Sequence, residues 1–181
     1  EVPLGKRSEL VDYRGSGFDR GHLVPAADMA RSQKAMSESF LLSNMAPQVG
    51  PGFNRGIWKH LEEKARQWAM ERKNIYVMTG PLYLDETGSR ISDLSRLITI
   101  GPDRVAIPSH FYKIVVSVGA DLGDLDAIAF ILPNTSNPSN ILPSFITSID
   151  EVERLTGLDF LKELEDVREA ELESRVASSV W

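Results

Sequence analysis

One amphipathic segment followed by a series of strand-like runs constrains the fold of this chain more than any other feature. Apolar side chains recur at the spacing of one face of an α-helix, at Ile57, Leu61, Ala65 and Trp68. The residues before them are rich in proline and glycine, which marks a loop. Asn54 then suits the N-cap or the first turn. The sequence therefore predicts a helix from Asn54 to about Lys73, with Trp58 and Trp68 in the core.

Runs of β-branched and aromatic residues follow this helix and predict a central sheet. They span Ile75–Thr79, Leu97–Ile100, Val105–Ile107, Phe111–Val118 and Ala127–Leu132. The polar stretch Asn134–Pro143 predicts a long surface loop. A charged segment from Asp150 to about Val176 predicts one helix, whose inward side chains are Val152, Leu155, Leu161 and Leu164. With 181 residues and neither repeat nor linker, we expect a single domain over 1–181.

The region before the helix is less regular. Residues 1–21 hold few apolar side chains and a Gly-Ser-Gly turn at 15–17, so we expect an irregular entry segment. Two short segments, His22–Pro25 and Phe40–Leu42, are predicted as strands. A loop or short helix is expected between them, over Arg31–Ser39.

Charge is distributed unevenly along the chain. The formal net charge of −6 argues against a generic nucleic-acid binder, which usually has a basic surface. Residues 1–73, however, carry 12 Lys and Arg against 9 Asp and Glu, a net of +3, whereas residues 74–181 carry 8 against 17, a net of −9. A polyanionic partner would therefore meet the first half.

The absence of cysteine excludes a disulfide framework, a thiolate metal site and a cysteine nucleophile. A structural zinc module is disfavoured, because three scattered histidines without cysteine offer no closed tetrahedral site. His60 and His110, taken alone, are interpreted as structural. No apolar run is long enough for a membrane span, so no membrane partner is expected.

Three short segments bring together the groups that phosphodiester hydrolysis needs. They are Asp19-Arg20-Gly21-His22, Leu42-Ser43-Asn44-Met45-Ala46-Pro47-Gln48, and the run from Asn54 to Glu62. An imidazole with a pKa of about 6.5 can take a proton from water at neutral pH. A hard divalent cation can neutralise phosphate charge, and magnesium accepts few protein oxygen ligands when substrate phosphate is present. The segments thus offer a base, a neutral oxygen ligand, a carboxylate and guanidinium groups.

The predicted helix places several of these groups on one face. Positions four apart drift by only about 40° around a helix, which places Asn54, Trp58, Glu62 and Arg66 on one stripe. Asn54 would meet the metal, and Glu62 could accept hydrogen bonds from water around it. Arg20 and Arg66 would face phosphate oxygens as planar donors.

The chain resembles the DNA/RNA non-specific endonucleases, most closely the endonuclease G branch. The resemblance rests on the Asp12–His22 run, on Leu-Ser-Asn-x-x-Pro-Gln and on Asn-x-x-x-Trp-x-x-Leu-Glu. It extends, in order, through Thr79–Tyr83, Ile107–Lys113 and Glu153–Leu158. It implies the ββα-metal finger nuclease fold, an α+β fold with a central mostly antiparallel sheet flanked by helices. Family members have further strands and another functional arginine before this segment, so we expect a fragment or a shortened N-terminus.

The resemblance also implies a mechanism and a set of site residues. The activity would be a sugar-non-specific cleavage of DNA and RNA with a single Mg²⁺, which Mn²⁺ could replace, giving 5′-phosphate and 3′-hydroxyl ends. The implied roles are His22 as general base, Asn54 as direct metal ligand, Glu62 as ligand through water, Arg20 and Arg66 as phosphate contacts, and Asn44 as a supporting residue. The alternative is a catalytically silent nucleic-acid-binding protein of the same fold, which is disfavoured because His22, Asn54 and Glu62 are all present.

Expectations on partners and location are indirect. Besides DNA and RNA, a homodimer and a protein inhibitor are expected from the family. The Leu155–Leu161 segment looks more bacterial than mitochondrial, which favours a secreted or periplasmic enzyme over the mitochondrial alternative.

Overall fold

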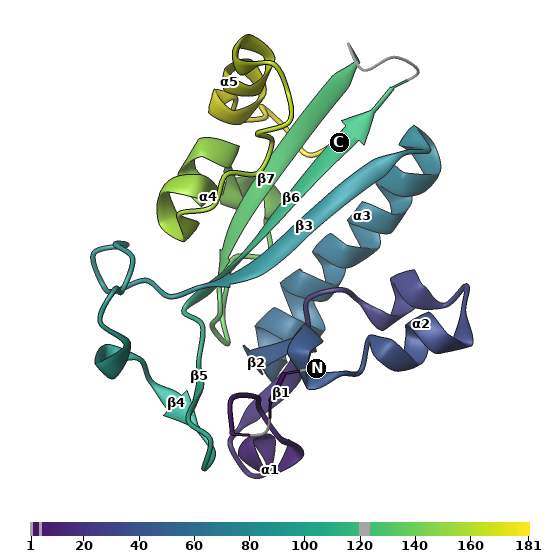
Figure 1. The fold of residues 1–181 in the computed structure, drawn as a ribbon. Helices are drawn as coiled ribbons and strands as arrows, with labels where there is room; N and C mark the ends of the chain where they lie inside the picture. The colour runs from purple at the N-terminus through teal and green to yellow at the C-terminus, as the bar shows by residue number, and fades with distance from the viewer. Residues whose placement is uncertain (1, 4, 120–123) are drawn as a thin grey trace.

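The computed structural model describes residues 2–3, 5–119 and 124–181. The main sheet has four strands. Figure 1 shows a long helix on one side of this sheet and shorter helices on the other. The helices are α1 (Leu10–Tyr13), α2 (Gln33–Glu38), α3 (Lys59–Arg72), α4 (Ile149–Thr156) and α5 (Asp166–Ser174). The strands are β1 (Phe18–His22), β2 (Met45–Val49), β3 (Ile75–Leu82), β4 (Thr99–Ile100), β5 (Val105–Ala106), β6 (His110–Val118), β7 (Leu125–Pro133) and β8 (Ile146–Thr147). The arrangement confirms the expected α+β fold.

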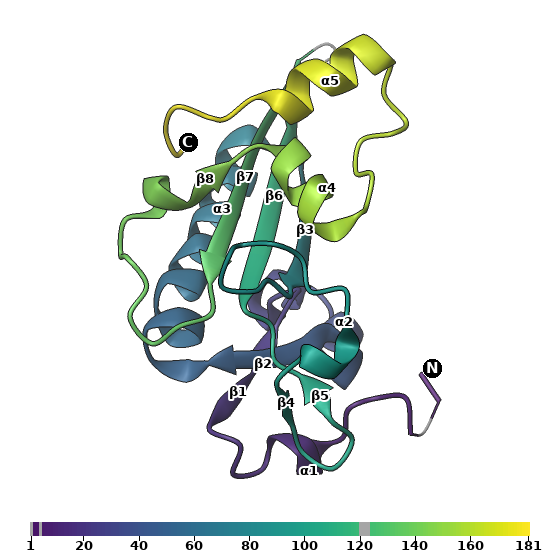
Figure 2. The same ribbon diagram turned by 90° about the vertical axis from the view of Figure 1, so that its left-hand side faces the viewer.

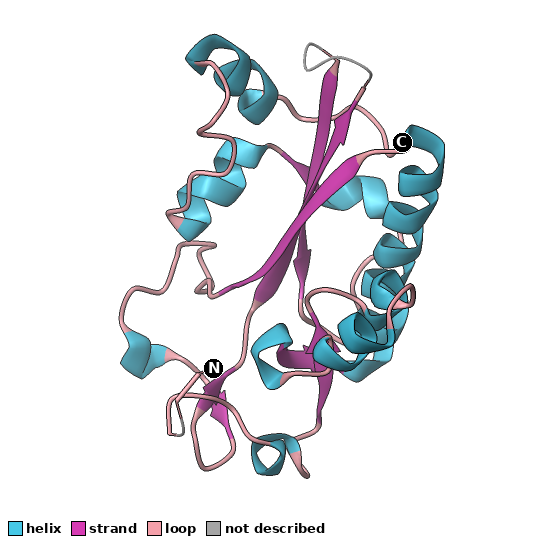
Figure 3. Ribbon diagram, turned by 45° about the vertical axis from the view of Figure 1, so that its right-hand side comes forward, coloured by secondary structure: helices cyan, strands magenta, loops and turns pink. Residues whose placement is uncertain are grey.

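The main sheet has the order β3-β6-β7-β8, and every neighbouring pair is antiparallel. Alternate residues of its central strands face opposite sides, as the pleat requires. Phe111 and Val115 of β6 belong to the core against α3, whereas Tyr112 and Ile114 belong to the core against α4 and α5. Figure 3 shows the sheet edge-on between these two sets of helices. The central strands β6 and β7 are therefore buried on both faces.

Helix α3 fits its face of the sheet as its apolar spacing predicted. Leu61, Ala65 and Trp68 are buried against the β6 and β7 side chains, and Trp58 is fully buried just before the helix. The expectation that both tryptophans lie in the core is confirmed. Among the described residues, no helix combines the length and the apolar character needed to cross a bilayer.

Two smaller units lie below the main sheet (Figure 2). Strands β1 and β2 form an antiparallel ribbon, and β4 and β5 form a separate two-stranded sheet. The prediction that Leu97–Ile100 and Val105–Ile107 join the central sheet is thus wrong. The turn between β4 and β5 contacts the N-terminal region. There the buried Asp12 accepts, through Oδ1, a 2.9 Å hydrogen bond from the backbone N–H of Asp103.

The first two strands are also displaced from their predicted positions. Phe18–His22 forms β1, so the chain leaves this strand where His22–Pro25 was expected to begin one. Phe40 lies in a turn and Leu42 begins a short 3-10 turn, after which Met45–Val49 forms β2. The short helix expected within Arg31–Ser39 is present as α2.

The C-terminal region contains two helices rather than the one predicted from Asp150 to Val176. Gly157, with φ 73°, ends α4 in a left-handed conformation that glycine adopts without strain, and its N–H donates to the carbonyl of Glu153. An irregular segment then leads to α5. Val152 and Leu155 are buried as expected, whereas Leu161 and Leu164 are partly buried.

Candidate active site

The β1–β2 ribbon carries the Asp19-Arg20-Gly21-His22 motif along one strand. Its register pairs His22 with Met45 and Gly21 with Ala46. Gly21 is buried, and a Cβ at this position would collide with the side chain of Gln48. Glycine is therefore required here by close packing, and the packing fixes the strand that presents His22.

A cavity of about 680 Å³ opens beside this strand. It is lined by Leu10, Tyr13, Arg14, Phe18, Asp19, Arg20, His22 and Asn54. The structure thus brings together three of the predicted site residues, from β1 and from the segment that follows β2. Glu62 and Arg66 are not among the described residues that line it.

The imidazole of His22 is half-buried and packs edge-on against the ring of Phe40, with centroids 4.9 Å apart. Its Nε2 is buried without a hydrogen-bond partner. Burial, and secondly the positive charge of Arg20, lower the pKa of His22 below its ordinary value. The neutral ring, which can accept a proton, is therefore the form at neutral pH.

Asn54 does not cap a helix, which corrects the prediction. Helix α3 begins only at Lys59, and the preceding segment Gly50–Trp58 contains non-helical backbone at Pro51, Gly52 and Gly56. Asn54 therefore lies in a kinked turn, and the predicted stripe of 54, 58, 62 and 66 holds only for its helical part.

The side-chain amide of Asn54 is held by Asp19. Asn54 Nδ2 donates a 2.9 Å hydrogen bond to Asp19 Oδ2, and the same oxygen forms a 3.1 Å ion pair with Nε of Arg55. Asn54 Oδ1 has no partner among the described residues. An amide oxygen without a hydrogen-bond partner is a suitable ligand for a hard divalent cation such as Mg²⁺.

Glu62 and Arg66 lie on α3, next to the loop that follows β1. Nη1 of Arg66 forms a 3.0 Å ion pair with Oδ1 of Asp28, so the predicted phosphate contact already has a carboxylate partner. Burial raises the pKa of Glu62 to about 7, although the nearby Lys113 opposes the shift. Burial therefore makes the neutral form of this carboxyl more favourable than it is in water.

Lys113 is a buried cation that sequence reasoning did not single out. Its side chain lies on the α3 face of β6, only 1% exposed, where an apolar residue would be usual. Nζ donates a 2.8 Å hydrogen bond to Thr79 Oγ1 and lies 4.6 Å from the centre of the Trp58 ring. Burial lowers its pKa to about 8, and the charge of Glu62 works against this shift. When protonated, Lys113 thus places a positive charge near Glu62.

Asn44 fixes the chain that leaves His22. Its Oδ1 accepts a 3.0 Å hydrogen bond from the N–H of Val24, and its Nδ2 donates to the carbonyls of Val24 and Ser39, at 2.8 and 2.9 Å. The residue therefore braces the loop beside the imidazole.

The other two histidines lie elsewhere. His60 is exposed on α3, and His110 begins β6 with Nδ1 3.1 Å from Ser109 Oγ. Asp19, Phe40 and Lys113 are the residues that sequence reasoning missed. Asp19 could have been found because it belongs to the same motif as His22, and Lys113 because it interrupts an apolar strand.

The chain is also similar to known proteins in sequence and in fold. The family model described as DNA/RNA non-specific endonuclease matches residues 2–167. Nuclease 1, mitochondrial, of Schizosaccharomyces pombe is 43% identical over 88% of this chain and 51% of its own length. Endonuclease G, mitochondrial, of Homo sapiens is 41% identical over 86% of this chain and 52% of its own length.

A solved structure, titled as the EndoG/EndoGI complex and the mechanism of EndoG inhibition, superposes with a TM-score of 0.81 at 39% identity. The alignment covers 91% of this chain and 67% of that chain. Nuclease C1 of Cunninghamella echinulata var. echinulata is 42% identical over 91% of this chain and 65% of its own length. The chain thus spans between half and two thirds of these curated relatives. It belongs to the DNA/RNA non-specific endonuclease family.

Proposed function

We propose that this chain is a magnesium-dependent endonuclease that hydrolyses phosphodiester bonds in both DNA and RNA and leaves 5′-phosphate and 3′-hydroxyl ends. The observation that carries the proposal is the cavity shared by His22, Arg20 and Asn54. A neutral base, a guanidinium and a free amide oxygen there match the proton transfer, charge neutralisation and metal binding that the reaction needs. Backbone phosphate is the group these residues address, so sequence preference should be slight.

The proton of the attacking water would go to Nδ1 of His22. Nε2 of the same ring is buried, so we assign Nδ1 as the nitrogen that accepts the proton. As the water oxygen bonds to phosphorus, the bond to the 3′ oxygen breaks. That oxygen takes up a proton from a solvent water, and His22 later returns its proton to solvent. Arg20, exposed at the rim of the cavity, is positioned to donate hydrogen bonds to the phosphate oxygens.

The unpartnered Oδ1 of Asn54 fits a hard divalent cation. Glu62, which lies on α3 outside the lining of the cavity, would be the carboxylate that orders water around the cation. When bound, Mg²⁺ would neutralise charge on the phosphoryl oxygens and on the departing 3′ oxygen, and Mn²⁺ could replace it. Asp19 would keep the amide of Asn54 turned so that its oxygen is available. Arg66 would contact phosphate only after exchanging its partner Asp28, so its role is secondary to that of Arg20.

A plasmid-nicking assay with purified protein tests the activity. Supercoiled DNA and a transcribed RNA should both be cut in Mg²⁺ or Mn²⁺, and EDTA should abolish both reactions. Ligation of the DNA products without further treatment should succeed, because ligase requires a 5′-phosphate and a 3′-hydroxyl. DNA cleavage with intact RNA would contradict the lack of sugar preference. Binding without any cleavage would favour the catalytically silent alternative.

The names of the relatives also bear on location and partners. The names of nuclease 1 of Schizosaccharomyces pombe and endonuclease G of Homo sapiens both carry the word mitochondrial, which supports the mitochondrial alternative over a secreted or periplasmic location. We therefore propose a mitochondrial site of action, testable by fractionating the source cells. The EndoG/EndoGI complex supports a protein inhibitor as a partner, and a homodimer is proposed from the family alone. Light scattering of the purified protein tests the dimer.

A further inference from the structure

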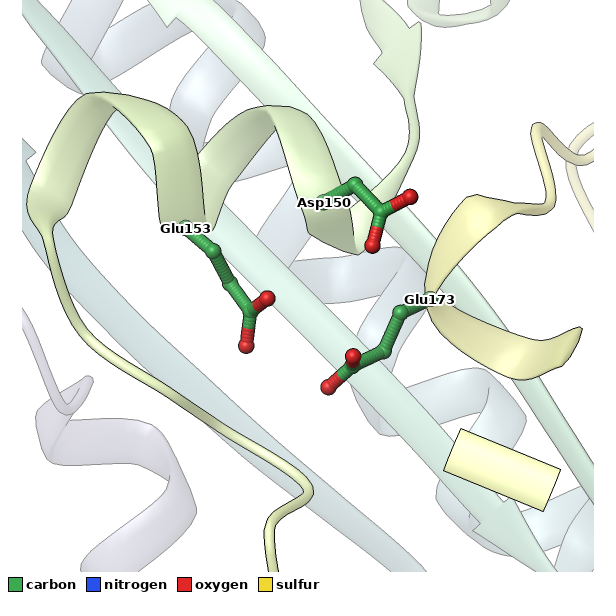
Figure 4. A group of neighbouring side chains, drawn as sticks. All are labelled: Asp150, Glu153 and Glu173. Atoms are coloured by element: carbon green, nitrogen blue, oxygen red, sulfur yellow. The ribbon is translucent and has the colours of Figure 1, made fainter. Parts of the chain in front are cut away.

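Five carboxylates gather where α4 meets α5, on the side of the main sheet away from α3. Two overlapping groups share Glu173: one adds Asp150 and Glu153, and the other adds Asp159 and Glu169. Within each group the ligand oxygens lie within 4.8 Å of one another. Figure 4 shows Glu153 and Asp150 of α4 and Glu173 of α5 directed into the same space.

Glu173 distinguishes this cluster from an ordinary acidic surface. Its side chain is only 7% exposed, and its Oε1 is buried without any hydrogen-bond partner. Figure 4 shows that its carboxylate is aimed at Glu153. A buried, unpartnered carboxylate oxygen beside further carboxylates costs free energy unless a positive species is bound there.

Basic side chains of the described part of the chain do not neutralise this cluster. Among the described residues, no Lys or Arg forms an ion pair with any of the five carboxylates. Of the arginines beside them in sequence, Arg154 pairs with Glu151, Arg168 with Glu171 and Arg175 with Asp126. In keeping with this, burial, and then the charges of Glu153 and Glu169, raise the pKa of Glu173 to about 7.

We propose that Glu173, Glu153 and Asp150 bind a calcium ion that ties α5 to α4. Ca²⁺ takes about six to eight oxygen ligands at roughly 2.3–2.6 Å, so two ligands on opposite sides of it lie close to 5 Å apart. Oxygens within 4.8 Å of one another fit that span. Mg²⁺ usually keeps several waters and is held by one or two carboxylates, so three carboxylates in one place favour Ca²⁺. Asp159 and Glu169 add negative potential on the other side of Glu173.

The site would be structural, because it is built on different elements from the His22 cavity. Helix α5 continues into the C-terminal segment, where Trp181 packs on Trp68 of α3 at a centroid distance of 5.5 Å. A cation that joins α4 to α5 would therefore hold this segment against the body of the protein. It would act by binding the folded chain in preference to the unfolded chain.

Thermal unfolding of the whole chain at pH 8, after EDTA treatment and dialysis, tests the proposal. Increasing CaCl₂ should raise Tm by several degrees, and an equal concentration of MgCl₂ should raise it less. Glu173→Gln should lose the response to calcium, and without calcium it should unfold no earlier than the wild type, because one repelled charge is gone. Glu163→Gln, an exposed position outside both groups, is the matched control and should respond like the wild type.

A second variant and a second method separate this site from the proposed active site. Asn54→Ala should keep the calcium response, and calorimetric titration of that variant should find one calcium site that Glu153→Gln removes. A wild type with no calcium-dependent rise in Tm overturns the proposal and indicates that a shared proton alone relieves the cluster. Retention of the full response by Glu173→Gln, or an equal response to magnesium, also overturns it. Nuclease activity is not the readout, so failure here leaves the proposed function untouched.

Discussion

Nδ2 of Asn54 donates a hydrogen bond of 2.9 Å to Oδ2 of Asp19, so the motif strand β1 orients the amide that we propose as the metal ligand. Residues that orient a ligand commonly change metal affinity by about 10–100-fold when replaced. Asp19→Asn should raise the Mg²⁺ concentration for half-maximal rate by a factor of that order. Arg55→Ala, which removes the other partner of Asp19, is the control and should leave it unchanged. A wild-type magnesium dependence in Asp19→Asn would refute the orienting role.

Replacing His22 should affect proton transfer and leave metal binding intact. His22→Ala should lose roughly 10²–10⁴-fold in rate, the usual contribution of a positioned general base, with little change in magnesium requirement. Added imidazole should restore part of the activity, and Asn54→Ala should show no such rescue. His60→Ala, exposed on α3, should keep full activity. If the only defect of His22→Ala were a higher magnesium requirement, His22 would not be the base.

Arg20 should set the pH at which activity is lost on the acid side. Burial and the Arg20 charge both lower the pKa of His22, so its neutral form persists below the pH at which an ordinary imidazole becomes protonated. Removing the charge in Arg20→Gln makes the imidazolium less unfavourable and raises that pKa. The acid limb of kcat/KM, measured from about pH 5 to pH 8, should therefore move to higher pH. Arg14→Gln, in the same cavity, should not move it; an unmoved limb in Arg20→Gln counts against the coupling.

Asn134 should matter for stability although it lies in a segment predicted as a surface loop. Its buried amide accepts a 2.8 Å hydrogen bond from the N–H of Val49 and donates to the carbonyls of Pro47 and Pro108, at 3.1 and 2.9 Å. Asn134→Ala leaves these groups unpaired, which should cost at least about 2 kcal/mol. That loss corresponds to a fall in Tm of about 2–4 °C for each kcal/mol. The exposed Asn137→Ala should unfold like the wild type, and equal Tm values for the two variants would disprove the bracing role.

The parts of the fold that sequence predicted best are those whose burial follows a simple period. The apolar face of α3 and the alternating strands β6 and β7 are of this kind, because packing against the sheet requires the same spacing that the sequence displays. The first strand was predicted at the wrong position. The residues of β1, Phe18-Asp19-Arg20-Gly21-His22, have almost no strand-like composition, and their extended conformation depends on pairing with β2. Gly157 is the sequence signal for the early end of α4, because glycine adopts the left-handed backbone of a helix C-terminus without strain.

For the candidate site, sequence identified the residue types but not their partners. His22, Arg20 and Asn54 do share one cavity. The contact of Asp19 with Asn54 depends on the kink between Gly52 and Gly56, which no helical period describes. The ion pair of Arg66 with Asp28 joins residues far apart in the chain, and short-range patterns carry no information on it.

The contact between Trp68 and Trp181 gives the protein an optical reporter. The two indoles meet at an interplanar angle of 71°, and Nε1 of Trp68 donates a 3.0 Å hydrogen bond to the backbone carbonyl of Trp181. Indoles this close and this skewed share their electronic transitions, so they contribute a paired circular dichroism signal that an isolated ring lacks. Trp58, the remaining tryptophan, stacks instead on Phe53. The circular dichroism signal of the Trp68–Trp181 pair therefore reports the docking of the C-terminal segment onto α3. This signal can be lost while the rest of the spectrum stays native.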